Sequence, residues 1–308
     1  METKLLNEVI ACLPKGKTHY RYYKNAYAAK LLNMAMRHDA PIKSVRRSRY
    51  AKLLNNVLLK GVVANSGDGV VRKQQLDSLW QEPSLPFILT AAKWRYCSRG
   101  WSQVSRPGDN LVLQLNMSTQ HDQLYERYVH NYDFNPYTCH PVLSKRRRSI
   151  ARETLAWSRI DFDLSSDEAL IEEIQSDAIR EMLWLKNYTM KRDDSRSRND
   201  KTYLEWFEPY LKCWQEAMLM ATVEFIRYEL GISRIYIHTD TSGWKVKKMR
   251  KNWLPPKSLY SDLPRKFAFK QTWNAPEFLL GTRGYKNLIR KQPDIDFYLL
   301  DFTQSIAA

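Results

Sequence analysis

The sequence predicts an α+β protein, with a basic helical region over residues 1–85 and a mixed sheet flanked by helices over residues 86–308. Apolar residues make up 44% of the 308 residues, which is enough for a core and excludes a disordered chain. The first region carries apolar side chains at helical spacing, whereas the second alternates apolar and polar residues as strands do. These two patterns define the predicted division of the chain.

The N-terminal region is expected to consist of short helices. Residues 2–12 carry apolar side chains at helical spacing. The phrase YAAKLLN at 27–33 returns as YAKLLN at 50–55, and Pro41 breaks the helical pattern between the two copies. A helix, a turn and a second, basic helix are the outline of a helix-turn-helix, and a plain helical bundle gives the same outline.

The positive charge of the chain is concentrated near its start. The net charge is +16, and residues 1–110 hold 19 Lys and Arg against 7 Asp and Glu, a net +12. Basic residues interleaved with Tyr and Trp suit phosphate contact and base stacking, so we expect a nucleic-acid partner, DNA or RNA. A basic surface that only keeps the protein soluble is the alternative. The candidate nucleic-acid-binding residues are Arg46, Arg47, Arg49, Lys52, Arg146, Arg147 and Arg148.

Several classes of protein are excluded by what the sequence lacks. Its apolar runs are far shorter than the roughly 18 residues of a membrane helix, so no membrane partner is expected. The N-terminus has no secretory signal pattern, which favours a cytoplasmic protein. The four cysteines lie far apart without CxxC spacing, so no zinc site is expected.

Strands and helices are expected to alternate in the second region. Residues 110–117 read as a strand, and residues 154–164 and 168–177 read as a hairpin around the turn SSD. The elements expected after the hairpin are a helix at 178–188, an exposed loop at 191–200, a long helix from Tyr203 to Gly231, and strands at 234–239, 267–273 and 296–302.

The hairpin carries the densest set of polar side chains. Alternation places Arg159 and Asp161 on one face of the first strand, and Glu173 and Gln175 on one face of the second. An unpaired carboxylate inside a core is costly, so this face is either an exposed set of ion pairs or a polar site at the strand ends. The ends of strands in α/β sheets often face ligands. The candidate ligand-binding residues at these ends are Ser176, Asp177, His238 and Thr239.

The phrase EEIQSD at 172–177 resembles EEIQSDW in uncharacterised domains of the large polyvalent proteins of phages and conjugative elements. The matching parts are Arg159, this phrase, Trp214 and IYIHT, and Ala178 stands where those proteins carry Trp. The resemblance covers roughly residues 110–300. It implies an origin in a bacterial mobile element and brings no established activity.

The order of elements also resembles the GNAT (Gcn5-related N-acetyltransferase) fold. PPKSLYSDLPRKFAF at 255–269 is similar to the family phrase in which a Tyr protonates the departing thiolate, which implies Tyr260 as general acid. The resemblance implies acetyl-CoA as donor and an RNA-linked or protein amine as acceptor. In that family a Gly-rich loop holds the pyrophosphate of CoA, whereas SDAIREM follows EEIQ here without a glycine. The candidate catalytic residues are Glu173, Gln175, Tyr260, Arg159 and Asp161.

Two alternatives remain open. Asp161, Glu173 and Gln175 resemble the metal-binding pattern of PD-(D/E)xK nucleases, which implies Mg²⁺ and a nucleic-acid substrate. The third possibility is a non-catalytic nucleic-acid-binding module in which the polar hairpin only stabilises the sheet.

Overall fold

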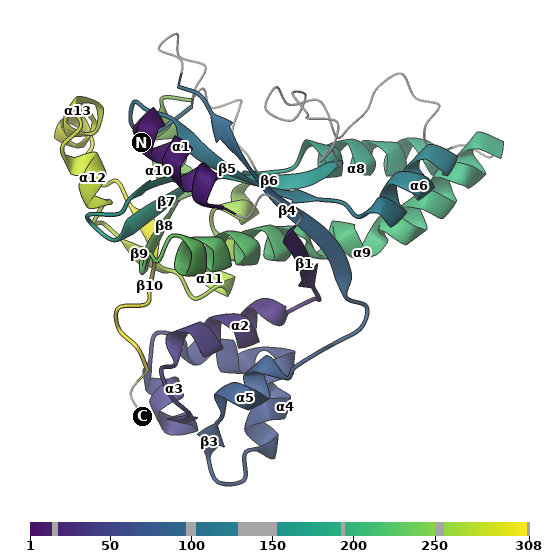
Figure 1. The fold of residues 1–308 in the computed structure, drawn as a ribbon, viewed down its shortest axis with the longest axis horizontal. Helices are drawn as coiled ribbons and strands as arrows, with labels where there is room; N and C mark the ends of the chain where they lie inside the picture. Colours follow the sequence, from purple (N-terminus) through teal and green to yellow (C-terminus); the bar gives the residue numbers. More distant parts are fainter. Residues whose placement is uncertain (14–17, 97–102, 129–152, 192–194, 250–255, 307–308) are drawn as a thin grey trace.

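The computed structural model shows a mixed α/β protein with a large sheet flanked by helices (Figure 1). None of the described helices is both long and apolar enough to cross a membrane. The described residues are 1–13, 18–96, 103–128, 153–191, 195–249 and 256–306.

The sheet has eight strands in the order β1-β4-β5-β6-β7-β8-β10-β9. All neighbours are antiparallel except β7 and β8, which run parallel. The strands are β1 (Thr18–Tyr22), β4 (Leu85–Trp94), β5 (Asn110–Asn116), β6 (Thr154–Asp163), β7 (Glu168–Gln175), β8 (Arg234–His238), β9 (Lys270–Thr272) and β10 (Phe297–Asp301). The hairpin β6–β7 and the strands β5, β8 and β10 were all predicted. The strand predicted at 267–273 is confirmed only for its second half.

Two irregularities lie at the end of β7. Its pairing with β8 runs from Glu168 to Ile171 and stops there. On the other side, the register with β6 shifts, because Arg159 is opposite Glu173 while the next residue of β6 is opposite Ile171. Glu172 is therefore the extra residue of a β-bulge, a feature that re-aims side chains and is often found beside active sites.

One long helix covers the main apolar face of the sheet. α9 (Ser195–Glu224) lies across the strands, and its buried Phe207, Met218 and Leu219 belong to the main core cluster. It continues into a π-helical turn, η2 (Phe225–Glu229). Residues 195–200, predicted as an exposed loop, are the first turns of this helix, so that prediction was wrong for them.

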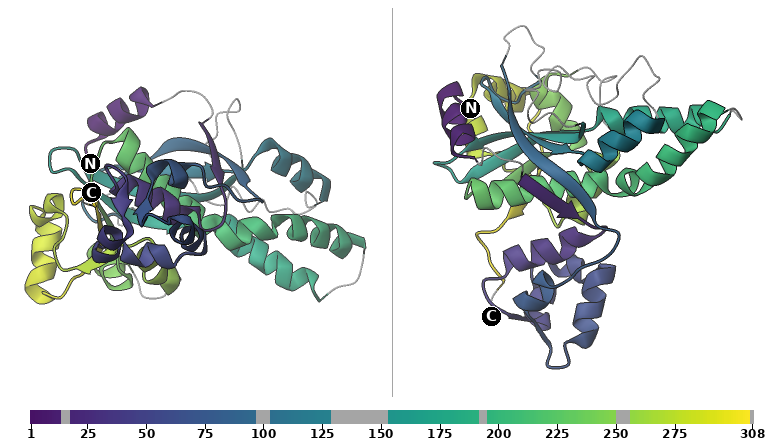
Figure 2. Two further views of the ribbon diagram at one scale, coloured as in Figure 1. Left: turned by 90° about the horizontal axis from the view of Figure 1, so that it is seen from below. Right: turned by 45° about the vertical axis from the view of Figure 1, so that its right-hand side comes forward.

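The other helices of this part lie around the edges and the second face of the sheet (Figures 1 and 2). A smaller apolar cluster joins Tyr285 of α13 and Leu279 of α12 to Tyr236 and Phe297 of β8 and β10. The helices are α1 (Thr3–Cys12), α6 (Thr119–Tyr128), α8 (Asp177–Thr189), α10 (Asp240–Lys247), η4 (Lys257–Leu259), α11 (Asp262–Lys266), α12 (Glu277–Leu280) and α13 (Arg283–Lys291).

The helices between β1 and β4 form a separate lobe, residues 26–77, which we call the helical lobe (Figures 1 and 2). Because β1 is a strand of the main sheet, the region 1–85 is not wholly helical. The lobe contains α2 (Ala26–Ala35), β2 (Ala40–Pro41), α3 (Ile42–Arg47), η1 (Ala51–Asn55), α4 (Val57–Asn65), β3 (Val70–Val71) and α5 (Lys73–Asp77).

The single basic helix predicted after Pro41 is divided into α3 and the 3₁₀ turn η1. Ser48 ends α3: its hydroxyl donates to the carbonyl of Val45 at 2.7 Å and accepts from the N–H of Tyr50 at 3.1 Å. Such local side-chain bonds compete with helix continuation. The break turns Tyr50 toward the sheet, where its hydroxyl donates to the carbonyl of Asp301 at 2.9 Å.

Candidate functional site

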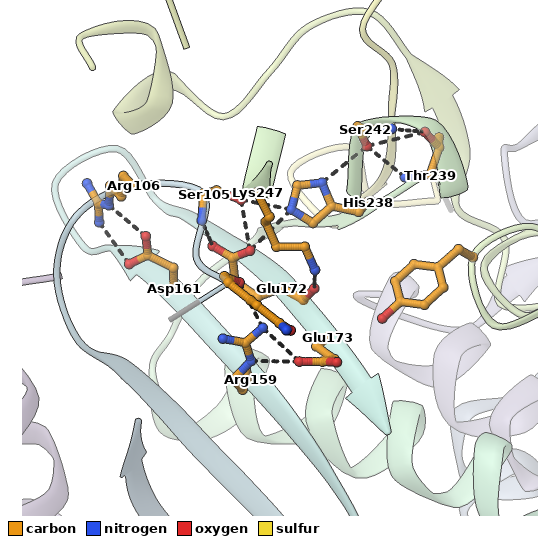
Figure 3. A network of polar contacts seen from close by, with 12 residues as sticks. Ser105, Arg106, Arg159, Asp161, Glu172, Glu173, His238, Thr239, Ser242 and Lys247 are labelled. Carbon is orange, nitrogen blue, oxygen red and sulfur yellow. Dashed lines mark hydrogen bonds and ion pairs between the residues drawn. The ribbon is translucent and has the colours of Figure 1, made fainter. Parts of the chain in front are cut away.

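The bulge in β7 brings the polar side chains of the hairpin together with the end of β8 (Figure 3). Glu172 and Glu173 both reach polar partners on the same side of the sheet, instead of alternating between faces. Regular alternation, as assumed from the sequence, would have sent one of them into the apolar core. The bulge thus doubles the number of carboxylates at this point.

Glu172 is fully buried and is the centre of a hydrogen-bond network. Ser105 donates to it twice, from its backbone N–H to Oε1 at 2.9 Å and from its hydroxyl to Oε2 at 2.8 Å. Nε2 of His238 lies 3.2 Å from Oε2 of Glu172 and 2.9 Å from Oγ of Ser105. The side chains of Glu172, His238 and Ser105 therefore join the β6–β7 hairpin, the strand β8 and the segment before β5.

The partners of the two ring nitrogens of His238 determine which of them carries the proton. Nδ1 lies 3.1 Å from Oγ of Ser242, which itself accepts the N–H of Thr239 at 2.9 Å. Because an ionised Glu172 can only accept hydrogen bonds, a neutral His238 carries its proton on Nε2, and Nδ1 accepts from the hydroxyl of Ser242. Thr239 and Ser242 also form the capping box that begins α10.

The network holds Glu172 ionised and His238 neutral. Burial alone would raise the pKa of Glu172, but the hydrogen bond from His238 and the charges of Lys247 and Arg159 outweigh it, so this pKa lies below its ordinary value. Burial lowers the pKa of His238, and Glu172 only partly opposes this effect. Burial also lowers the pKa of Lys247.

Arg159 is completely buried and pairs with Glu173, at 2.7 Å from NH2 and 2.9 Å from Nε to Oε2. Its guanidinium also donates to the carbonyl of Gln103 at 2.9 Å and stacks over the ring of Trp94, 4.5 Å from the centroid. Glu173 itself remains 8% exposed, whereas Glu172 is 0% exposed. Glu173 is therefore the less buried of the two residues.

Asp161 belongs to a separate pair. Its carboxylate receives two hydrogen bonds from Arg106, at 2.6 and 3.0 Å, and one from the amino group of Met1 at 3.0 Å. Figure 3 shows this pair to one side of the Glu172–His238 network. The grouping on which the nuclease alternative rests is therefore divided: Asp161 pairs with Arg106, Glu173 pairs with Arg159, and Gln175 donates to Asp177.

Beyond Ile171, where the pairing with β8 has ended, two backbone groups of β7 are bonded to side chains. The ammonium of Lys247 donates to the carbonyl of Glu172 at 2.8 Å, and the N–H of Ile174 donates to the hydroxyl of Tyr260 at 3.3 Å. Burial, with the charge of Glu173 adding to it, raises the pKa of Tyr260, so its hydroxyl stays protonated. Beside these groups lies a pocket of about 180 Å³ lined by Lys247, Tyr260 and Lys257.

The residues that follow β7 mainly shape the start of α8. The hydroxyl of Ser176 accepts the N–H of Ile179 at 3.0 Å as the N-cap. Asp177 accepts from the amide of Gln175 at 3.0 Å and pairs with Arg180. Because Asp177 lies buried in the first turn, its charge opposes an anion at this helix start.

The predicted nucleic-acid-binding residues differ in their surroundings. Arg46, Arg47 and Lys52 are exposed on the helical lobe. Arg49 instead points to the sheet, where it donates to the carbonyl of Leu299 at 2.9 Å and lies 3.5 Å from the carboxylate of Asp301. Arg146, Arg147 and Arg148 lie outside the described residues.

Four members of the site were not among the candidate residues taken from the sequence: Ser105, Glu172, Ser242 and Lys247. Lys247 lies in KVKKMRK, a charged run that reads equally as a phosphate contact or as a solvated helix face. Ser105 is 67 residues from Glu172 and 133 from His238, so no local pattern joins them.

Within the described ranges, no group of three or more His, Cys, Asp or Glu is arranged to hold a metal ion. Comparisons with models of known families, with curated proteins and with solved structures find no match for this chain. The fold and the geometry of this site are therefore the basis for a function.

Proposed function

We propose that this protein is an acyltransferase of GNAT-like topology that moves an acyl group from a CoA-type thioester to an amine, with a nucleic acid as its partner. The observation that carries the proposal is the opening between the parallel strands β7 and β8 beyond Ile171 and Ile237. An extended thioester arm can enter there and bond to strand backbone.

The opening has backbone groups ready for such a ligand. The carbonyl of Glu172 and the N–H of Ile174 point toward β8, and each is bonded to a side chain, Lys247 or Tyr260, that a ligand can replace or share. The β-strand geometry places these groups two residues apart, the spacing with which an amide-bearing chain pairs to a strand.

The side chains at the opening can carry acyl transfer. The amine nitrogen attacks the thioester carbonyl carbon and gives its proton to Glu173, and the carbon–sulfur bond then breaks. Tyr260, whose raised pKa keeps it protonated at neutral pH, gives its proton to the departing sulfur. Arg159 holds Glu173 in place, and Glu172 and His238 fix the ends of the two strands. Gln175 and Asp161 have no part in this step.

The start of α8 does not offer the usual place for the pyrophosphate of CoA. Asp177 lies there and no glycine precedes the helix. Lys247 and Lys257 line the pocket beside Tyr260 and supply positive charge for an anionic donor. We therefore expect the thioester arm to be held mainly by the strands.

A transfer assay tests this function. The protein is incubated with acetyl-CoA and with protein or tRNA amines, and the release of free thiol is measured. We expect release that depends on the acceptor and is lost in Tyr260→Phe. Equal release by wild type and by this variant would refute the role of Tyr260, and no release from any acceptor would count against the reaction.

The nucleic-acid partner is supported by three exposed cations of α3 and η1 in the helical lobe, Arg46, Arg47 and Lys52. Within the described residues, none of them forms an ion pair. Phosphates are the partner that such cations fit.

A further inference from the structure

The helix α13 lies at the outer edge of the molecule and has one apolar and one basic side (Figures 1 and 2). On the apolar side, the ring centroid of the buried Tyr285 lies 6.5 Å from that of Phe297, and Leu288 and Ile289 pack against the same cluster. The basic side carries four exposed cations, Arg283, Lys286, Arg290 and Lys291. The first three are spaced by three and four residues, so they form one row along the helix.

These cations have no partners within the part of the chain that the structure describes. None of the four forms an ion pair or a side-chain hydrogen bond there, and α13 contains no Asp or Glu. Elsewhere on the surface, helices pair their cations with acids: Lys4 lies 4.0 Å from Glu8 on α1, and Lys212 lies 3.3 Å from Glu208 on α9. The charge of α13 is therefore left for solvent or for a partner.

The basic row disfavours the helix that carries it. Like charges three or four residues apart destabilise a helix, and the row contains two such pairs, Arg283 with Lys286 and Lys286 with Arg290. Arg283 also lies in the first turn, next to the positive end of the helix dipole. An anion lying along the row would remove both penalties.

The shape of the row fits a polymer of phosphates. From Arg283 to Arg290 it extends over about 10 Å, because a helix rises about 1.5 Å per residue. A nucleic-acid duplex presents one negative charge for about every 1.7 Å of its axis, so several phosphates face a row of this length. The only aromatic residue of α13, Tyr285, is buried and cannot stack on bases. This favours a duplex, which turns its phosphates outward, over a single strand with open bases.

An anionic membrane is the less suitable partner. A helix that binds a bilayer surface places its apolar side in the lipid. The apolar side of α13 is already packed on β8 and β10, so only the cations are available.

The helix α10 packs beside α13 and adds to its charge. Lys248 is exposed at its left-handed C-cap, and Lys245 lies in the last turn before it. Lys247 of the same run instead bonds to the carbonyl of Glu172 at the β7–β8 opening. The basic surface is therefore separated from that opening by one helix.

We propose that α13 binds the phosphate backbone of a nucleic-acid duplex through Arg283, Lys286 and Arg290, and that the cations of α10 extend the contact. The inference rests on the nucleic-acid partner of the proposed function and does not depend on acyl transfer. It adds a contact surface to that of the helical lobe. Because phosphates carry no sequence information, this contact has no sequence preference.

Fluorescence anisotropy with a short duplex of mixed sequence, at several salt concentrations, tests the proposal on the full chain. The variant Arg283→Gln, Lys286→Gln, Arg290→Gln should bind at least about tenfold more weakly at low salt. The slope of log K against log salt should fall by up to about 3, since each phosphate contact contributes about one. Urea unfolding should show the variant to be at least as stable as wild type, because two pairs of like charges are removed.

The matched control removes three exposed cations that have acidic partners. Lys4→Gln, Lys186→Gln, Lys212→Gln changes the net charge by the same amount and should keep the slope of wild type. A loss in the α13 variant no larger than in this control would overturn the proposal. Tighter binding of a single strand of the same length, or of phosphatidylserine vesicles, than of the duplex would overturn it as well.

The outcomes separate this surface from the proposed function. Absence of nucleic-acid binding by wild type would refute the partner itself. A slope that falls on removal of Arg46 and Arg47 but not in the α13 variant would keep the partner and refute this surface. Duplex binding that is lost in the α13 variant, in a protein that transfers no acyl group, would support the surface and refute the reaction.

Discussion

The hydroxyl of Tyr260 accepts the backbone N–H of Ile174 at 3.3 Å, just beyond the last residue of β7 that pairs with β8. The side chain of Tyr260 thus bonds to β7 where β8 no longer pairs with it, at the opening where we expect the thioester. This contact joins the candidate general acid to the backbone that would hold the substrate.

Tyr260→Phe should lower the rate of acyl transfer by about 10²–10⁴-fold, because the departing sulfur loses its proton donor. It should also cost about 1–3 kcal/mol of unfolding free energy, since the N–H of Ile174 is left unpaired. Steady-state kinetics and urea unfolding measure the two effects. Tyr50→Phe, which removes another buried tyrosine hydroxyl at 2.9 Å from its acceptor, is the matched control and should lower stability alone.

The Arg159–Glu173 pair should respond unequally to single and double substitution. Arg159→Met leaves Glu173 without its partner and should lower the free energy of unfolding by about 3–5 kcal/mol. Arg159→Met with Glu173→Gln should be less destabilised than that single variant, because no buried charge is left unpaired. Urea unfolding of wild type, both single variants and the double variant measures the coupling; strictly additive losses would contradict a direct pair.

Stability should fall as pH drops below about 6.5, the ordinary pKa of histidine. Burial lowers the pKa of His238 in the folded protein, so the unfolded chain takes up the proton first and acid favours unfolding. The stability that neutral His238 contributes is fully present above pH 6.5. Below that pH, the free energy of unfolding falls by up to about 1.4 kcal/mol for each pH unit. His238→Gln should show a flatter dependence between pH 7 and 5; an unchanged slope would show that His238 does not titrate there.

Nucleic-acid binding should depend on Arg46 and Arg47 but not on Arg49. Removing both exposed arginines should reduce the slope of log K against log salt by about 2, since each phosphate contact contributes about one. Arg49→Ala should leave the slope unchanged and lower stability, because Arg49 bonds to the carbonyls of β10. Fluorescence anisotropy at several salt concentrations measures the slope, and equal slopes in all variants would place the binding surface elsewhere.

The strands β5 and β6 were predictable because they alternate apolar and polar residues, and β7 because it follows β6 across the polar turn SSD. The strands β1 and β4 were not predicted. THYRY of β1 reads as a basic, aromatic contact segment, but Tyr22 is fully buried with its hydroxyl on Glu216 at 3.1 Å. The burial of Tyr22 depends on a hydrogen-bond partner 194 residues away, and the local sequence does not reveal such a partner.

The site was predictable in composition but not in grouping. Glu173, Arg159, His238 and Tyr260 were recognised from their residue types and positions. The bulge at Glu172 was not, because a one-residue register shift leaves no mark in the pattern of a strand. That shift brings Glu172 beside Glu173, whereas Asp161 is held apart by Arg106 and the amino group of Met1.

The central claim is that an acyl donor enters the opening between β7 and β8, and equilibrium unfolding with and without acetyl-CoA tests it most directly. At a ligand concentration of 100 times Kd, the free energy of unfolding should rise by about 2.7 kcal/mol. 3′-Phospho-ADP, the nucleotide part of CoA, serves as the control for binding of that part alone and should stabilise less than acetyl-CoA. No stabilisation at saturating acetyl-CoA, or the same stabilisation by the nucleotide alone, would contradict the account.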